Sequence, residues 1–243
     1  MRTVRRLLPP AEYRRWLGHV IKAAPAVIAR RTLGVVDERL GEDLSFCAPD
    51  GRFLHTQGAA FGVVREIFGH RCYAEPAQLR DARHILDLGA NAGVFTLFAL
   101  SCAPEARVHS VEAQPHFLPV IHANVAVNRF AERTTVENAI VGGSFNEWTQ
   151  SLRSNHPQVA DFSISRYLSK VGQCDFLKCD VEGAEFELFQ GDLEWLGAVR
   201  GIALEYHGDW AAGATLCQRI AAAGFTSRQA ERGALGYIFA ERR

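Results

Sequence analysis

His84-Ile-Leu-Asp-Leu-Gly-Ala-Asn-Ala-Gly-Val94 is the segment from which the fold class of this chain can be predicted. Its first half is an apolar run typical of a buried β-strand, and a helix is expected to begin near Val94. Gly89 and Gly93 permit backbone angles and close approaches that a side chain would block. In an open α/β sheet such a loop lies beyond the carboxyl end of its strand, where ligands bind. The segment therefore predicts a cofactor loop at Asp87–Gly93.

Strands and helices alternate along the rest of the chain. Strand-like runs are expected at residues 84–88, 107–112, 134–137, 174–179, 199–206 and 234–240. Helical stretches are expected at residues 94–102, 115–129 and 182–190. This order is typical of βαβ units, so the fold class is predicted to be α/β, with a doubly wound and mostly parallel sheet. The last part differs, because Gly224-Phe-Thr-Ser-Arg228 and Gly236-Tyr-Ile-Phe-Ala240 are typical of an antiparallel hairpin at the sheet edge.

The spacing of the loop glycines indicates the kind of cofactor. Gly89 and Gly93 form a Gly-x-x-x-Gly pattern, which differs from the Gly-x-Gly-x-x-Gly that sets a pyrophosphate on a helix N-terminus. Asp87 would repel a diphosphate, but it suits a cofactor that carries an ammonium and a sulfonium group. Glu112 closes the second strand 23 residues after Gly89, where its carboxylate can accept hydrogen bonds from both ribose hydroxyls. These residues predict a nucleoside cofactor without a diphosphate.

The composition is that of an ordinary soluble globular protein, with 48% hydrophobic and 22% charged residues among 243. The formal net charge is zero, which gives no support to a nucleic-acid partner, although residues 1–31 hold eight Lys or Arg against the single Glu12. Six scattered cysteines without a Cys-x-x-Cys pair indicate reduced thiols. No apolar run approaches the roughly 20 residues of a membrane span. The basic N-terminus lacks the apolar core of a signal peptide, so we expect a cytoplasmic protein without membrane contact.

Residues 1–80 are expected to form a helical and β-hairpin extension, and residues 81–243 the cofactor-binding domain. A helix is predicted from about Ala11. Its packing face is predicted to be Trp16, Val20, Ala24, Val27 and Ile28. Leu44–Cys47 and Arg52–His55 flank a Pro-Asp-Gly turn and are typical of a hairpin. The α/β core is complete without the extension, which we therefore expect to act as a lid, a substrate contact or a homodimer contact.

Two motifs of this chain resemble those of the FkbM family of methyltransferases. The first is Asp87-Leu-Gly-Ala-Asn-Ala-Gly-Val-Phe-Thr96, and the second, more specific one is Phe176-Leu-Lys-Cys-Asp-Val-Glu-Gly-Ala-Glu185. Further segments are also similar to the family's pattern, namely Pro49-Asp-Gly51, Arg65-Glu-Ile-Phe-Gly69 with Tyr73, Asn138-Ala139 and Ile164-Ser-Arg-Tyr-Leu168. The resemblance covers roughly residues 44–207, and residues 1–40 and 144–161 depart from it.

The resemblance implies a seven-stranded, Rossmann-like (class I) methyltransferase sheet with S-adenosylmethionine as the methyl donor. It also implies a small-molecule acceptor, usually a hydroxyl of a sugar or a secondary metabolite. The residues that it implies for the cofactor site are Asp87, Gly89, Ala90, Asn91, Gly93, Glu112, Ala113, Gln114, Phe117, Asn138, Ala139 and Asp180. Of these, Gln114 and Phe117 are expected near the adenine ring.

Methyl transfer to a hydroxyl requires the protein to align the acceptor and to take its proton. Asp180 follows the fourth strand, and Glu205 and His207 follow the fifth, so neighbouring strands would bring the three side chains together. We expect Asp180 to be the general base, with His207 as the second choice. The two carboxylates and the imidazole could instead bind a divalent cation, for which Mg²⁺ is the best match. Asp180 could also cap the next helix, and Glu185 is open to a structural or a substrate-facing role.

Other functions have less support from the residues. A nicotinamide-dependent oxidoreductase would need a third loop glycine and a Tyr-x-x-x-Lys pair or its equivalent, and the sequence has neither. An N-methyltransferase that acts on a small molecule is compatible with the same donor site. A binding module without catalysis is disfavoured because Asp87, Glu112 and Asp180 are all present. A nucleic-acid methyltransferase is disfavoured because the chain is neutral and lacks an Asn-Pro-Pro-Tyr-like motif.

Overall fold

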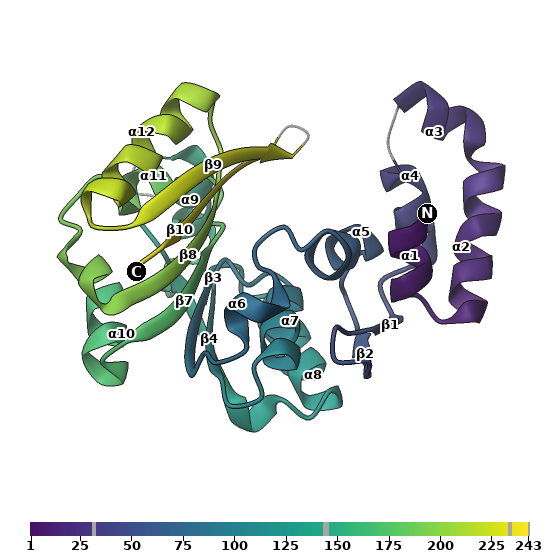
Figure 1. Cartoon of the computed structure of the whole chain (residues 1–243), viewed down its shortest axis with the longest axis horizontal. Coiled ribbons are helices and arrows are strands. Elements are labelled where there is room, and N and C mark those ends of the chain that lie inside the picture. Colours follow the sequence, from purple (N-terminus) through teal and green to yellow (C-terminus); the bar gives the residue numbers. More distant parts are fainter. Residues whose placement is uncertain (31–32, 143–145, 233–234, 243) are drawn as a thin grey trace.

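The computed structural model of the chain describes residues 1–30, 33–142, 146–232 and 235–242. Their strands form one eight-stranded sheet and a separate two-stranded hairpin (Figure 1). The order across the large sheet is β6-β5-β4-β3-β7-β8-β10-β9. The strands from β6 to β8 are parallel, whereas β10 is antiparallel to both β8 and β9. The predicted α/β fold, with a mostly parallel sheet and an antiparallel C-terminal hairpin, is confirmed.

The strands of the large sheet lie close to their predicted positions. In chain order they are β3 (His84–Leu88), β4 (Arg107–Glu112), β5 (Thr134–Ile140), β6 (Ala160–Asp161), β7 (Cys174–Cys179), β8 (Val199–Tyr206), β9 (Thr226–Arg232) and β10 (Leu235–Glu241). Strand β5 is longer than predicted, and the two-residue β6 is an addition to the seven strands that the family resemblance implies. Ala234, predicted as the first residue of the last strand, lies outside the described residues.

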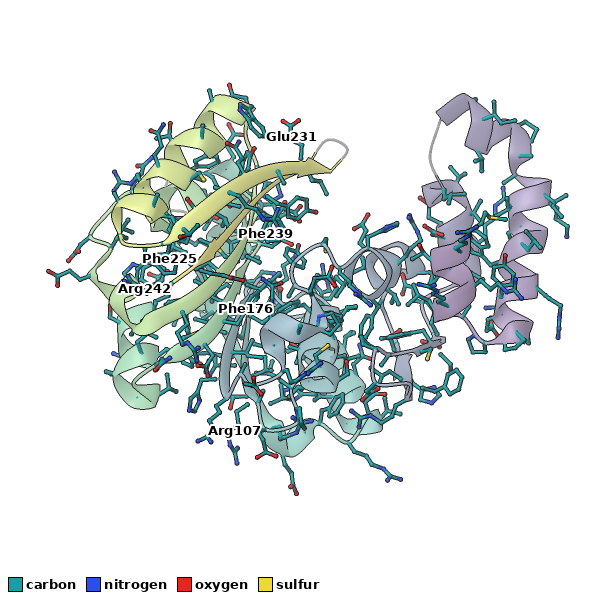
Figure 2. All side chains as sticks on the ribbon, viewed as in Figure 1. Arg107, Phe176, Phe225, Glu231, Phe239 and Arg242 are labelled. Atoms are coloured by element: carbon teal, nitrogen blue, oxygen red, sulfur yellow. The ribbon has the colours of Figure 1, made fainter. Side chains whose placement is uncertain are left out.

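Helices cover both faces of the large sheet. In the part of the chain from β3 onward they are α7 (Val94–Cys102), α8 (Phe117–Val127), η3 (Ala131–Arg133), α9 (Glu147–Asn155), α10 (Ile164–Val171), α11 (Glu185–Leu188), η4 (Glu194–Ala198) and α12 (Trp210–Ala222). Successive side chains of a strand point to opposite faces. Accordingly, Ile85 packs in a core with α7 and Leu86 in a second core with α10. Phe176 and Phe239, labelled in Figure 2, belong to the core of Ile85.

The N-terminal region forms a helical group and a small hairpin. Its elements are α1 (Arg2–Leu7), α2 (Pro10–Lys22), α3 (Ala24–Arg30), α4 (Gly34–Asp37), η1 (Glu38–Leu40), β1 (Leu44–Cys47), β2 (Phe53–Thr56), α5 (Phe61–Val64), the π-helix η2 (Arg65–Gly69) and α6 (Pro76–Leu79). In Figure 1 the helices α1 to α4 lie at the opposite end of the long axis from α12. The division into an extension of residues 1–80 and a domain of residues 81–243 stays a prediction.

The predicted packing face of the first long helix is only partly correct. Trp16 is fully buried, and its indole nitrogen donates a hydrogen bond to the Asp37 carboxylate (3.1 Å). Ile28, by contrast, is 76% exposed. The reason is a break at Ala23, after which a new helix begins at Ala24. A periodicity extrapolated across that break assigns Ile28 to the wrong face.

The helix predicted at residues 182–190 is shorter than expected. Glu182 and Gly183 have φ angles of 53° and 94°, in the left-handed region, so the helical conformation begins only at Glu185. The delayed start leaves a loop between the end of β7 and α11. This loop lies beside the cofactor loop, and its shape determines the site described below.

The C-terminal hairpin is joined to the rest of the sheet by the pairing of β10 with β8, and Arg242, just after β10, adds side-chain contacts. Its guanidinium lies 4.5 Å from the ring centre of Phe225 and donates a hydrogen bond to the Leu196 carbonyl (3.2 Å); both Arg242 and Phe225 are labelled in Figure 2. Such a cation–π contact favours a fixed position of the last strand. No helix in the described part of the chain combines the length and the apolar character that crossing a bilayer requires.

Candidate active site

The cofactor loop and the end of β7 are in direct backbone contact. The Asp180 amide donates a hydrogen bond to the Leu88 carbonyl (3.1 Å). Gly89 has a φ of 76°, and a Cβ at this position would lie 1.7 Å from the Asp180 carbonyl oxygen. Only glycine is compatible with both the angle and the distance. Gly89 therefore allows the two loops to meet, which brings Asp180 to the rim of the cofactor loop.

A first cavity, of about 540 Å³, opens along the carboxyl ends of β3, β4, β5 and β7. The lining residues are Gly89, Asn91, Val111, Glu112, Ala113, Gln114, Ala139, Ile140, Val141, Trp148, Thr149, Asp180, Val181 and Glu182. The cavity therefore lies where an open α/β sheet is expected to bind its ligand.

Glu112 joins two loops at the wall of this cavity. Its carboxylate accepts hydrogen bonds from the backbone amides of Asn91 (2.7 Å) and Gln114 (2.8 Å). Burial raises the pKa of Glu112, although these two amides oppose the effect. Each carboxylate oxygen retains a second lone pair that can accept a hydrogen bond from a ligand hydroxyl.

The charges around the first cavity have one sign. Glu112, Asp180 and Glu182 all line it, and no Lys or Arg is found among its described lining residues. A diphosphate would meet three carboxylates without a counterion, which is strongly unfavourable. A cationic ligand would be attracted by the same carboxylates. The lining therefore fits an ammonium and a sulfonium group and does not fit a dinucleotide.

Seven of the twelve residues expected at the cofactor line this cavity. They are Gly89, Asn91, Glu112, Ala113, Gln114, Ala139 and Asp180. The structure places the other five elsewhere. Ala90 lines a neighbouring cavity, Gly93 caps α7, and Phe117 packs against the hydrophobic core and the ring of His116.

Asn138 and Asp87, the remaining two, support the loops from behind. The Asn138 amide donates to the carbonyls of Glu112 (2.8 Å) and Ala113 (3.0 Å). The carboxylate of Asp87 is fully buried; it accepts from the Thr96 hydroxyl (2.8 Å) and lies 3.3 Å from the Lys178 ammonium. In this structure the charge partner of Asp87 is Lys178, and the contact expected between Asp87 and the cofactor stays a prediction.

Lys178 is a buried residue of the site to which the sequence assigned no role. Its buried ammonium donates to the carbonyls of Gly89 (2.6 Å) and Leu88 (3.2 Å) and lies 3.8 Å from the Asp180 carboxylate. Burial alone would lower the pKa of Lys178, but the carboxylates of Asp87 and Asp180 outweigh it and hold the pKa above its ordinary value. Lys178 therefore stays charged and links the cofactor loop to the end of β7.

Trp148 and Thr149, at the start of α9, also line the first cavity and were not predicted. They lie in the segment that departs from the family pattern. Asn146 caps this helix by accepting from the Thr149 amide (2.7 Å) and donates to the Glu182 carbonyl (3.2 Å). Asn is a preferred N-cap residue, so Asn146 was the available signal for a helix that starts here.

A second cavity, of about 580 Å³, adjoins the first. It is lined by Val63, Glu66, Ile67, Cys72, Tyr73, Gly89, Ala90, Asn91, Ala92, Val94, Phe95, Lys178, Asp180, Glu205 and Leu235. Gly89, Asn91 and Asp180 line both cavities. Asp180 therefore stands at the junction of the two, accessible from either side.

Tyr73 connects the two predicted catalytic carboxylates. Its hydroxyl lies 2.8 Å from Asp180 Oδ2 and 2.8 Å from Glu205 Oε2. Tyr237 also hydrogen-bonds to Glu205. Burial raises the pKa of Glu205, and the nearby charge of Asp180 raises it further. The prediction that Asp180 and Glu205 lie close together is correct, but no role for Tyr73 was predicted.

His207 has a different environment from the one that a general base requires. Its Nδ1 lies 3.1 Å from Glu185 Oε1 and its Nε2 3.4 Å from Glu182 Oε2. The hydrogen bond to Glu185 raises the pKa of His207 to about 9, and burial opposes this only in part. At this pKa the imidazole is protonated near neutral pH, which favours Asp180 over His207 as the general base. The role of His207 as the second choice stays a prediction.

Glu185 has a structural role. Its fully buried carboxylate accepts from the backbone amides of Gly183 (2.8 Å) and His207 (2.6 Å). These bonds hold the left-handed loop after β7 against the end of β8. Of the two roles open from the sequence, the contacts of Glu185 favour the structural one.

The structure brings the predicted metal-binding set together. One ligand atom each of Asp180, Glu205 and His207 lie within 4.8 Å of one another, which is compatible with a shared ion. A histidine must be neutral to bind a metal, so an ion at this place would have to displace the proton that Glu185 favours on His207. The Tyr73 hydroxyl bonds to one oxygen of each carboxylate and leaves lone pairs on both. The metal site therefore stays a prediction, and no step is routed through it.

The charge on His207 can be measured directly. We expect NMR titration of its ring protons to give a midpoint near 9 rather than the ordinary 6.5. The pKa of His207 is higher in the folded than in the unfolded chain, so protonation of His207 stabilises the folded state. This contribution to the free energy of unfolding is complete below pH 6.5 and is lost as the pH rises through about 9. Glu185→Gln should lower the midpoint towards 6.5, and Glu182→Gln should lower it less. A wild-type midpoint near 6.5 would restore His207 as a base or a ligand.

Comparison with known proteins gives one family. A family model described as "Methyltransferase FkbM domain" matches residues 87–227, which is more than half of the chain. The match begins at Asp87 of the cofactor loop. It contains both motifs and ends at the second residue of β9.

Individual relatives are more distant. The chain is 39% identical over 77 residues to "31-O-demethyl-FK506 methyltransferase FkbM" of Streptomyces tacrolimicus, a match that covers 31% of this chain and 30% of that protein. It is 24% identical over 195 residues to "Methyltransferase 1" of Beauveria bassiana, covering 64% of this chain and 78% of that protein. A solved O-methyltransferase from Bacillus cereus in complex with SAH has a TM-score of 0.45 and 17% identity, covering 69% of this chain and 77% of that one.

Proposed function

The chain belongs to the FkbM family of methyltransferases, and we propose that it transfers a methyl group from S-adenosylmethionine to a hydroxyl group of a small molecule. The observation that carries this proposal is the junction of the two cavities at Asp180. One cavity suits a cationic nucleoside donor, the other has room for an acceptor, and a carboxylate stands between them. The name of the Streptomyces relative, an O-methyltransferase, agrees with a hydroxyl acceptor.

The chemistry of the first cavity supports S-adenosylmethionine as the donor. Glu112 offers its carboxylate to the ribose hydroxyls, and Asp180 and Glu182 balance the positive charges of the cofactor. Gln114 and Trp148 line the same cavity, and we assign them to the adenine end. Lys178 keeps the Leu88 and Gly89 carbonyls in place behind the loop. The oxidoreductase alternative loses support because a diphosphate has no cationic partner here.

Bound S-adenosylmethionine supplies a methyl group on a positively charged sulfur atom, so the protein needs to provide alignment and a proton acceptor. We assign the proton acceptor to Asp180, which lines both cavities. Its charge is favoured by Lys178 at 3.8 Å. Gly89 and Asn91 line both cavities as well, and we assign the alignment of the acceptor oxygen with the donor to this junction.

The second cavity supports an uncharged acceptor with an apolar body. Its lining is largely aliphatic and aromatic, with the carboxylates of Glu66, Asp180 and Glu205 at the polar end. The lining cation, Lys178, is already shared by Asp87 and Asp180. A phosphorylated or carboxylated acceptor would therefore meet uncompensated negative charge. A hydroxylated secondary metabolite or a neutral sugar matches this lining better.

The N-terminal extension has a position that supports a role on the acceptor side. Helix α1 packs on η2, where the Thr3 and Leu7 side chains lie next to Gly69. The same π-helix contributes Glu66 and Ile67 to the second cavity. We propose that residues 1–40 hold this wall in place rather than cover the cofactor, which narrows the roles expected from the sequence.

A direct assay tests the proposed function. The protein is incubated with S-adenosylmethionine labelled in its methyl group and with a panel of hydroxylated metabolites, each paired with its phosphorylated or carboxylated counterpart. We expect label in the neutral hydroxylated compounds. Calorimetry on the same preparation should detect S-adenosylhomocysteine binding and no NAD binding. Binding of NAD alone would reject the proposal.

Glu112 gives a prediction that depends only on the donor site. Glu112→Ala should weaken S-adenosylhomocysteine binding by about 1–3 kcal/mol, because two charge-assisted hydrogen bonds to the ribose are lost. Isothermal titration calorimetry measures the change. Glu137→Ala, an exposed carboxylate on the neighbouring β5 that pairs with His109, is the matched control and should bind normally. Equal affinity of the Glu112 variant and wild type would show that Glu112 does not contact the ribose.

A further inference from the structure

Tyr73 has one hydroxyl proton and two carboxylate neighbours. The phenolic oxygen is 2.8 Å from Asp180 Oδ2 and 2.8 Å from Glu205 Oε2. Both distances are those of O–H···O hydrogen bonds, yet one proton can serve only one of them. If both carboxylates are ionised, one oxygen at 2.8 Å is left without a proton. One additional proton in the group satisfies both contacts.

The surroundings decide where that proton rests. Lys178, which also pairs with Asp87, lies 3.8 Å from Asp180 Oδ2, and its ammonium is 5.2 Å from the ring centre of Tyr73. The other titratable groups facing the cluster are Glu66, Cys72, Glu182, Glu185, His207 and Tyr237. The cation is thus placed beside Asp180, whereas Glu205 is buried and bonded to two tyrosines. The ionised carboxylate is therefore more stable at Asp180 than at Glu205. The additional proton is more stable on Glu205.

We propose that Asp180, Tyr73 and Glu205 act as one proton-accepting group, in which Tyr73 passes to Glu205 the proton that Asp180 takes from the acceptor hydroxyl. This inference rests on the proposed function and extends it. It makes Glu205 the resting place of the proton and Tyr73 the residue that carries it. The direct role of Asp180 at the acceptor is unchanged.

The proposed methyl transfer and proton relay conserve atoms and charge. The acceptor oxygen forms a bond to the methyl carbon while the carbon–sulfur bond of the donor breaks, and that electron pair remains on sulfur. The acceptor proton goes to Asp180. A proton of Asp180 then passes to the Tyr73 oxygen as the Tyr73 proton passes to Glu205, so Asp180 is again ionised and Tyr73 neutral. The final arrangement has Glu205 donating to Tyr73 and Tyr73 donating to Asp180, with both 2.8 Å contacts satisfied.

This arrangement explains why a carboxylate pair can serve as a base near neutral pH. A general base works best when its pKa is close to the working pH, which is well above that of an ordinary carboxyl. The deprotonated group has an unsatisfied contact that an incoming proton repairs, and this increases its proton affinity. Burial of Glu205 acts in the same direction.

The two tyrosines that contact Glu205 provide a test, because their replacement should shift the titration midpoint of Glu205 in opposite directions. A hydroxyl that only donates to a carboxylate lowers its pKa, and removing it raises the pKa. The hydrogen bond from Tyr237 lowers the pKa of Glu205, so Tyr237→Phe should raise the titration midpoint of Glu205. Tyr73 gains a second satisfied bond when Glu205 is protonated, so Tyr73→Phe should lower that midpoint, by about 1 pH unit for the loss of one net hydrogen bond.

The measurement is ¹³C NMR titration of protein labelled at the Glu side-chain carboxyl, in EDTA and without acceptor. The Glu205 signal is assigned by its absence in Glu205→Gln. Binding of S-adenosylhomocysteine by both Tyr→Phe variants shows that they are folded. A lower midpoint in Tyr73→Phe together with a higher one in Tyr237→Phe supports the shared proton. A higher or unchanged midpoint in Tyr73→Phe overturns it.

This titration separates the inference from the proposed function, because it needs neither turnover nor an identified acceptor. If methyl transfer fails with every acceptor but the two midpoints move in opposite directions, the shared proton stands and the assignment of the reaction is wrong. If an acceptor is found, the turnover of Tyr73→Phe should be lost at a lower pH than that of Tyr237→Phe, because only the deprotonated group can act as a base. Parallel pH profiles of the two variants would count against the relay.

Discussion

Asp180→Asn should lower the turnover of methyl transfer by roughly 10²–10⁴-fold, the usual contribution of a general base. Asn has the shape of Asp but cannot accept the proton of the acceptor hydroxyl. The loop should keep its shape, because the Asp180 backbone, rather than its side chain, bonds to Leu88 and lies against Gly89. S-adenosylhomocysteine also lacks the sulfonium charge that Asp180 is proposed to balance, so its affinity should remain close to that of wild type. Steady-state rates and calorimetry measure the two quantities.

Two controls make this result specific. Asp192→Asn changes an aspartate that bonds to the Glu194 amide away from both cavities, and it should leave turnover unchanged. If Asp180 acts as a general base without a metal ion, adding EDTA to wild type should have no effect. Loss of activity in EDTA that Mg²⁺ restores would assign Asp180 to a metal site instead. Full turnover in Asp180→Asn would show that Asp180 is not a general base and that catalysis rests on the alignment of donor and acceptor.

The elements of the sheet could be predicted from local patterns. Strands β3, β4, β7 and β8 have the predicted bounds, since each is an apolar run between turn residues, and α7 begins after Gly93 as expected. The errors occur where the chain departs from a regular period. Glu182 and Gly183 are left-handed and shorten α11, and the break at Ala23 changes the phase of the N-terminal helices. A composition pattern cannot reveal these backbone angles.

The site could be predicted as a location but not in its detailed contacts. The sequence placed Asp180 and Glu205 at neighbouring strand ends, and the structure brings them to opposite sides of one hydroxyl. Tyr73 comes from the loop after η2, and no local rule states which strand end that loop approaches. For His207, the deciding neighbour is Glu185, whose position depends on the left-handed loop. Contacts between residues that are distant in sequence could not be predicted.

Lys178 is a partial exception, because its partner follows from strand register. Parallel pairing of β3 and β7 places Lys178 directly opposite Asp87. Opposite charges on paired residues of neighbouring strands attract each other, and both strands lie in the middle of the sheet, where a single charge would be costly. The Lys in the motif Lys-x-Asp-Val-Glu could thus have been recognised as the counterion of Asp87. That reading would have removed Asp87 from the expected cofactor contacts.

The same pairing leads to the largest expected effect on stability. Lys178→Met should lower the free energy of unfolding by about 3–5 kcal/mol, the range found when one partner of a buried ion pair is removed. The Asp87 carboxylate, which is fully buried, would lose its cation, and the carbonyls of Leu88 and Gly89 would lose a donor. For a chain of this length the melting temperature should fall on the order of 10 °C. Urea unfolding followed by circular dichroism measures the change.

Two further variants test whether the loss of stability in Lys178→Met is due to charge. Lys170→Met, at an exposed position of α10, should change stability little. Adding Asp87→Asn to Lys178→Met removes the uncompensated carboxylate, so the double variant should recover part of the lost stability. Recovery is expected because an amide can keep the hydrogen bond from Thr96 without requiring a cation. A double variant no more stable than Lys178→Met would show that packing of the lysine side chain, and not its charge, holds β3 and β7 together at the cofactor loop.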